Sequence, residues 1–103
     1  DGGWPMYRQG DVLIVPVAEE SVPRGLRPEQ RDARGRLVLA EGEATGHCHA
    51  IPGPGTLFPG FLHLPEGGRL VHEEHDAISL PKGWFRVIRQ REYVPGAFRM
   101  VAD

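Results

Sequence analysis

Short runs of hydrophobic residues, separated by glycine and proline, follow one another along most of the chain. The clearest alternation spans 84–91 and sets Phe85, Val87 and Arg89 on one face of a predicted strand. Further strands are predicted at 11–17, 36–40, 47–51, 57–64, 69–72, 77–80 and 98–101, the one at 57–64 being interrupted by Pro59-Gly60. Turn signals about every 8–12 residues, with no amphipathic helix, predict an all-β fold. We expect a small β-barrel or sandwich of about seven to eight short antiparallel strands, with little or no helix.

Two segments fall outside this pattern of strands. Residues 1–7 are predicted to form an N-terminal tail, and 18–35 a long polar surface loop with one short helical turn near 28–32. Pro16 predicts an edge position for the strand at 11–17, because proline cannot donate to a β-ladder. The turn at 81–83 has the length of a hairpin connection between the strands on either side of it.

Composition narrows the class of protein. The 103 residues predict a single domain over 1–103, and 40% hydrophobic content is typical of a globular chain. A net charge of −2 makes nucleic acid an unexpected partner. One cysteine, Cys48, excludes an internal disulfide, and no apolar run approaches the roughly 20 residues that would span a membrane. With no secretion signal in the pattern, we expect a cytoplasmic protein without a membrane partner.

The five histidines all lie between positions 47 and 75. In a strand, residues two apart share a face, so His47 and His49 are predicted to point the same way and Cys48 the other way. A buried structural role is therefore expected for Cys48. His72 and His75 share a face of a strand only if a bulge or turn occurs between them.

The histidine spacing supports a metal-binding model. In this model His47 and His49 are joined by one or both of His72 and His75, with Glu43 or Glu74 as a carboxylate ligand. Zn, Ni, Fe and Mn all accept imidazole ligands, so the metal stays open. The alternative is a set of structural histidines without a metal, and His63 is expected to decorate its strand beside Phe61.

The order of these motifs resembles the cupin superfamily. Gly42 precedes His47-Cys48-His49, and Pro81-Lys82-Gly83 follows downstream. Cupins are small β-barrels that hold a metal through a His-x-His motif and a later histidine. The resemblance covers roughly 42–88 and implies a barrel and a metal, with the third ligand at His72 or His75, before Pro81.

Two further sets of residues carry candidate chemistry. Glu73 and Glu74 are candidate catalytic acid/base groups beside a metal-bound water, the alternative being two solvated turn carboxylates. Arg89 and Arg91 share a face with Phe85 and are candidate ligands of an anionic substrate, the alternative being surface arginines.

Two functions follow from these observations. The first is a small cupin-like metalloenzyme acting on a compact substrate, anionic if the arginines hold it. The second is a non-enzymatic β-barrel module for binding or assembly, with a structural metal or none. Under either, edge strands and a small core make a homo-oligomer an open expectation, and the substrate or protein partner is unknown.

Overall fold

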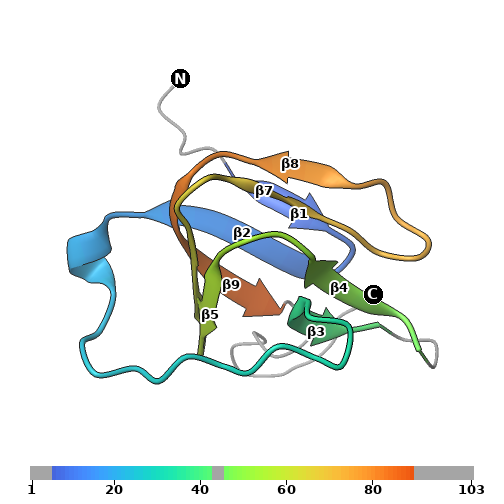
Figure 1. Cartoon of the computed structure of the whole chain (residues 1–103). Coiled ribbons are helices and arrows are strands. Elements are labelled where there is room, and N and C mark those ends of the chain that lie inside the picture. The colour runs from blue at the N-terminus through green and yellow to red at the C-terminus, as the bar shows by residue number, and fades with distance from the viewer. Residues whose placement is uncertain (1–5, 43–45, 90–103) are drawn as a thin grey trace, which may run out of the picture.

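The computed structural model describes residues 6–42 and 46–89. Within these ranges the fold is all-β and antiparallel, as predicted, and its only helical element is a 3-10 turn (Figure 1). None of its helical elements is long and apolar enough to cross a membrane. The elements are β1 (Tyr7–Gln9), β2 (Val12–Val17), η1 (Glu19–Ser21), β3 (Leu37–Glu41), β4 (Cys48–Ile51), β5 (Thr56–Phe58), β6 (Phe61–Leu64), β7 (Gly68–Leu70), β8 (Ile78–Leu80) and β9 (Gly83–Arg89).

The largest sheet has five strands in the order β1-β2-β9-β6-β5. Two-residue turns close the hairpins β1–β2 and β5–β6, and β9 lies between them, pairing with both β2 and β6. Gly10 and Gly60 each occupy one of these turns at positive φ, which glycine adopts without the steric cost of a side chain. In β9, Phe85 is buried and Arg86, on the opposite face, is exposed, as the alternation predicts, whereas Arg89, predicted on the face of Phe85, is exposed at the end of the strand.

Two further hairpins, β3–β4 and β7–β8, complete the fold. Ala50 of β4 and Val71, just after β7, exchange backbone hydrogen bonds of 3.0 and 2.8 Å, which joins the two hairpins. The hydrophobic core receives residues from the five-stranded sheet and from both hairpins. Its members are Val12, Ile14, Leu37, Leu39, Ala40, Ile51, Leu57, Leu62, Leu64, Leu70, Leu80 and Phe85.

The structure corrects three details of the predicted strands. Tyr7 belongs to a strand, β1, that the sequence pattern missed because it has only three residues. β2 is an inner strand, not an edge strand. Its partner β1 begins at Tyr7, opposite Ile14, so within the described residues Pro16 pairs only on its β9 side. The turn at 81–83 joins strands that pair elsewhere, β8 with β7 and β9 with β2 and β6. The predicted strand at 98–101 lies outside the described residues.

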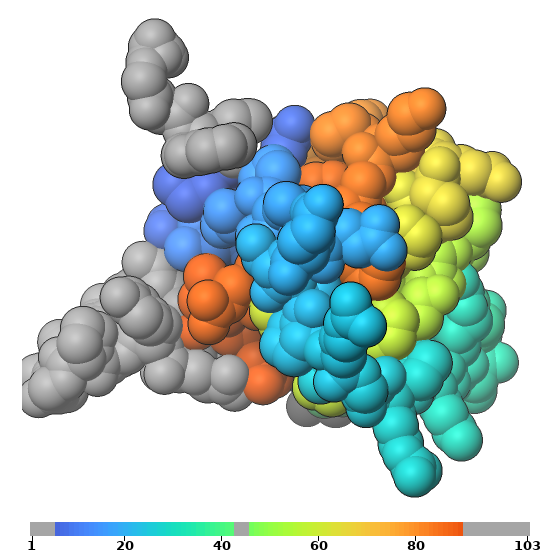
Figure 2. All heavy atoms as spheres, turned by 90° about the vertical axis from the view of Figure 1, so that its left-hand side faces the viewer, coloured from blue at the N-terminus to red at the C-terminus, as the bar shows by residue number. Residues whose placement is uncertain are grey.

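The long polar segment after β2 is irregular, as predicted, although its helical turn is η1 and lies earlier than 28–32. It lies across the middle of the face of the molecule shown in Figure 2. Arg31 fastens it to the rest of the fold, donating hydrogen bonds of 2.9 Å to the carbonyl of Gly53 and 3.0 Å to that of Gly55. The segment is therefore attached to the turn between β4 and β5 at a defined point.

Candidate metal centre

The β3–β4 hairpin presents the first histidine pair. Ala40 pairs with His49 and Glu41 with Cys48, and the N–H of Gly42 donates to the carbonyl of His47 at 2.8 Å. This pairing fixes the backbone on both sides of Cys48. His49 is buried, with 2% of its surface exposed, and the side chain of His47 is 24% exposed. One member of the pair thus lies inside the protein and the other nearer its surface.

The second histidine pair follows the pairing of Val71 with Ala50, which brings the end of β7 alongside β4. A bend at 73–75 then turns the chain, so that the rings of His72 and His75 come within 4.7 Å of each other, centroid to centroid. The turn that joint use of these two histidines requires is therefore present. It follows β7 directly and precedes β8.

All four predicted metal-ligating histidines lie in one cluster, hereafter the histidine cluster. The ring of His72 is its centre, with centroids 4.4 Å from His49, 4.7 Å from His75 and 5.6 Å from His47. His49 and His75 are 5.9 Å apart and nearly parallel. The spacing of 23 residues between His49 and His72 does not predict these distances between the rings, because they depend on the contact between Ala50 and Val71.

Glu73 adds a carboxylate to the histidine cluster. Ligand atoms of His47, His72 and Glu73 lie within 4.8 Å of one another, the only such group found among the described residues. The backbone N–H of Cys48 donates to Glu73 Oε1 at 3.0 Å. This bond, more than the neighbouring imidazoles, lowers the pKa of Glu73 below its usual range, so the group is a carboxylate near neutral pH.

The other predicted carboxylates differ in position. Glu74 Oε2 lies 3.8 Å from His47 Nδ1, but the side chain of Glu74 is 71% exposed. Glu43 lies outside the described residues. Of the predicted carboxylates that are described, Glu73 alone belongs to the group with close ligand atoms. The sequence had assigned it an acid/base role instead.

The turn of the β1–β2 hairpin contributes residues that the sequence analysis did not single out. Gln9 is buried, and its Oε1 lies 2.8 Å from His49 Nδ1. Asp11, on the other side of the turn, has Oδ1 3.8 Å from His49 Nε2. A polar residue in a three-residue strand carries no local signal of burial, which explains why the sequence pattern missed Gln9.

Two glycines leave room for the imidazole rings. A Cβ at Gly10 would lie 3.0 Å from His75 Nε2 and 3.2 Å from His49 Cε1. A Cβ at Gly42 would lie 2.9 Å from His72 Nε2 and 3.0 Å from the Cβ of His47. Backbone from two hairpins therefore packs directly on the histidine cluster. The resemblance to cupins made Gly42 a position in a sequence motif. The structure gives a steric reason for glycine at this position, because a side chain would collide with His72 and His47.

His72 has a constraint of its own. The backbone N–H of Glu74 donates to His72 Nδ1 at 3.0 Å, so the neutral ring carries its proton on Nε2. A metal can use His72 Nδ1 only when this hydrogen bond opens, which requires the bend at 73–75 to adjust. Metal binding and the conformation of the bend are therefore coupled.

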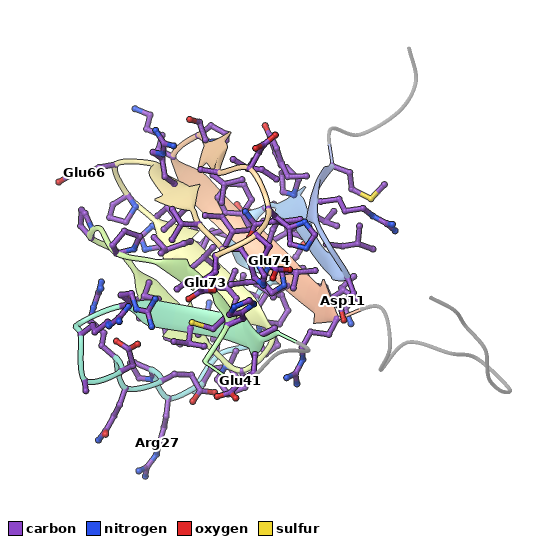
Figure 3. All side chains as sticks on the ribbon, turned by 90° about the vertical axis from the view of Figure 1, so that its right-hand side faces the viewer. Asp11, Arg27, Glu41, Glu66, Glu73 and Glu74 are labelled. Carbon is purple, nitrogen blue, oxygen red and sulfur yellow. The ribbon has the colours of Figure 1, made fainter. Side chains whose placement is uncertain are left out.

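The carboxylates of Asp11, Glu73 and Glu74 lie beside the histidine cluster. Figure 3 shows Glu73 and Glu74 near the centre of the view, with Asp11 to their right and Glu41 below them. Negative charge around neutral imidazoles attracts cations. The cluster therefore has the electrostatics of a cation site.

The remaining predicted site residues lie elsewhere. His63 instead stacks on Trp84, with ring centroids 4.1 Å apart and planes 14° from parallel. Arg89 ends β9 opposite Val12 and is exposed. Arg91 lies outside the described residues. Cys48 is buried, in agreement with a structural role.

A cavity of about 510 Å³ lies apart from the histidine cluster. It is formed where η1 and the segment after it approach β9, on the side of the molecule facing the viewer in Figure 2. Glu19, Glu20, Arg24 and Trp84 are among its lining residues. Glu73 and Glu74, beside the histidine cluster, are seen from the opposite side, in Figure 3. The two features are therefore separate.

Comparison with known proteins gives a family but no function. Neither a curated protein nor a solved structure shows significant similarity to the chain. One family model, described as a domain of unknown function (DUF8820), matches residues 8–90. This match includes all nine strands except the first residue of β1, and the whole histidine cluster. The chain therefore belongs to the DUF8820 family.

Proposed function

We propose that this protein binds a divalent transition metal at the histidine cluster and acts as a small metalloenzyme. The observation that carries the proposal is the convergence of His47, His72 and Glu73, whose ligand atoms lie within 4.8 Å of one another, with the rings of His49 and His75 beside His72. Two imidazoles and a carboxylate are donors that Fe²⁺, Zn²⁺, Ni²⁺ and Mn²⁺ accept. The cofactor is one of these four metals.

Exposure of the site supports a catalytic rather than a closed structural centre. Glu73, Glu74 and His75 are exposed, while His49 is buried beneath them. A metal held from the buried side would keep a coordination position toward solvent, where water or substrate binds. Glu74 is then the candidate for moving protons, since Glu73 is engaged by the Cys48 N–H.

The surrounding charge bears on the substrate. Asp11, Glu73 and Glu74 favour a cation and oppose an anion, so an anionic substrate needs a metal to offset them. Arg89 and Arg91 remain the candidate groups for such a substrate.

The resemblance to cupins also remains a proposal. In it, the five-stranded sheet and the two hairpins enclose the core as a small barrel-like domain, and the protein works in the cytoplasm.

A structural metal is the second candidate. The histidine cluster joins three segments that are distant in sequence: 9–11, 47–49 and 72–75. A metal bound there would connect three hairpins, and its binding energy would add to the stability of a small core. Four protein ligands around the metal would favour this role, and an open coordination position would favour catalysis.

The test is metal binding by the full chain, prepared without a histidine tag. The protein is stripped of metal, titrated with each of the four cations, and its bound metal measured by mass spectrometry. We expect one metal per chain in the wild type and in His63→Ala, and loss of binding in His47→Ala and His72→Ala. Sub-stoichiometric metal in the wild type with every cation would overturn the proposal.

A further inference from the structure

Gln9 is a buried polar residue whose three hydrogen bonds determine how its amide is oriented. Its Nε2 donates to the carbonyl of Leu70 at 3.0 Å and to that of Asp76 at 2.9 Å. Both acceptors are carbonyl oxygens, so they require the NH₂ group and use both of its protons. The carboxamide cannot be reversed without facing its own oxygen toward two others.

This orientation decides the protonation of His49. Gln9 Oε1 faces His49 Nδ1 at 2.8 Å and can only accept, so Nδ1 must carry a proton. In the neutral ring Nε2 then carries the lone pair. Nε2 is the atom that lies toward Asp11, at 3.8 Å from its Oδ1. The hydrogen bond on one ring nitrogen thus selects the other as the nitrogen that can bind a metal.

We infer that Gln9 is a positioning residue of the metal centre: it fixes His49 as the Nδ1–H tautomer and so makes His49 Nε2, 3.8 Å from Asp11 Oδ1, a further ligand atom. This inference rests on the proposed function. It adds His49 to the candidate ligands His47, His72 and Glu73. The ligand atom of His49 is Nε2, because its Nδ1 is engaged in the hydrogen bond to Gln9. Outer partners of this kind typically contribute about 10- to 100-fold to metal affinity.

The same contacts give Gln9 a structural role, so the test must separate the two. Gln9→Met has a similar length but neither donates nor accepts in this way. Gln9→Glu also loses both donated bonds, yet keeps an oxygen that can accept from His49 Nδ1. Both variants lose the bonds to Leu70 and Asp76, and Gln9→Glu in addition places an oxygen opposite these two carbonyls. Because this repulsion acts only against Gln9→Glu, retention of the Nδ1–H tautomer and of metal binding in Gln9→Glu but not in Gln9→Met reports on the bond to His49. Gln30→Met, exposed on the long loop, controls for the substitution itself.

The first measurement needs no metal. Nitrogen-15 NMR of the metal-free full chain at about pH 8, where imidazole is neutral, identifies which ring nitrogen of His49 carries the proton. We expect Nδ1–H in the wild type, Gln9→Glu and Gln30→Met, and loss of this preference in Gln9→Met. A wild-type ring protonated on Nε2 would overturn the inference, as would an unchanged Nδ1–H in Gln9→Met.

The second measurement is the affinity for Zn²⁺ or Co²⁺ of the same four proteins. We expect Gln9→Met to bind about 10- to 100-fold more weakly than the wild type, with Gln9→Glu and Gln30→Met within about threefold of it. Equal losses in Gln9→Met and Gln9→Glu would make Gln9 structural and overturn the inference. If the wild type bound no metal, the proposed function would fail, while the tautomer measurement would still decide whether Gln9 fixes His49.

Discussion

The backbone N–H of Cys48 donates to the carboxylate of Glu73 at 3.0 Å, linking β4 to the bend after β7. The bond holds the carboxylate beside His47 and His72, with which Glu73 forms the group of close ligand atoms. It also uses only one of the two carboxylate oxygens, so the other can serve a metal. A hydrogen bond across 25 residues therefore unites the two halves of the candidate site.

Replacing Glu73 by Gln separates its charge from its hydrogen bond. The amide keeps an oxygen that can accept from Cys48 N–H, so we expect the fold to be retained and the affinity for metal to fall by at least about tenfold. Isothermal titration with Zn²⁺ measures the change, and circular dichroism checks the fold. Glu74→Gln is the matched control, for which a smaller loss is expected. Equal losses of metal affinity in both variants would contradict the assignment of Glu73, rather than Glu74, as a metal ligand.

A side chain at Gly10 should disturb the histidine cluster. Gly10→Ala places a Cβ 3.0 Å from His75 Nε2 at φ +59°, so we expect about 1 kcal/mol loss of stability from the backbone and a weaker metal site from the displaced rings. Gly60→Ala is the control, because Gly60 has φ +79° in a similar turn with no atom within 4 Å of the added Cβ.

Urea denaturation and metal titration distinguish the two effects at these turns. Both variants should lose comparable stability, and only Gly10→Ala should lose metal affinity. Unchanged affinity in Gly10→Ala would show that the rings adapt freely, contrary to a preformed site.

Asp32 should make stability depend on pH at acidic values. Its carboxylate accepts the backbone N–H of Arg36 and, at 2.8 Å, a guanidinium N–H of the same residue, which lowers the pKa of Asp32. A lowered folded pKa stabilises the protein above the unfolded pKa, about 4, and this contribution disappears as pH falls through the folded value. Asp32→Asn should therefore be less stable than wild type at pH 7, with the difference shrinking below about pH 4.

Urea denaturation of wild type and Asp32→Asn across this pH range measures the free energy of unfolding of each protein. Subtracting one from the other cancels the effect of the other carboxylates, which titrate in both proteins. A gap that stayed constant down to about pH 2 would contradict a role for the charge of Asp32.

Arg31 should hold the long loop to the turn between β4 and β5. Arg31→Met removes the bonds to the carbonyls of Gly53 and Gly55, and we expect a loss of about 1 kcal/mol together with faster hydrogen exchange in 24–35. Arg34→Met is the control, since Arg34 is exposed and its backbone N–H, which the substitution keeps, donates to Asp32. Metal affinity should be unchanged in both, and equal exchange in both would argue against the attachment.

The sequence by itself determined the strands and part of the site. Hydrophobic runs bounded by glycine and proline predict most strands of the described ranges, because strand formation depends on local alternation. Alternation also places His47 and His49 on one side of Cys48, and the second pair was correctly expected to need a turn. These are properties of neighbouring residues, so they can be read without the fold.

Only the tertiary structure decided which groups meet. The contact between Ala50 and Val71 brings His72 within 4.4 Å of His49, centroid to centroid, and the β1–β2 turn brings Gln9 to His49 across 40 residues. Strand order also decided that Pro16 lies in an inner strand and that β8 and β9 do not pair. Contacts of this kind depend on how hairpins pack around a shared core, and a pattern with a period of two residues contains no information about that packing.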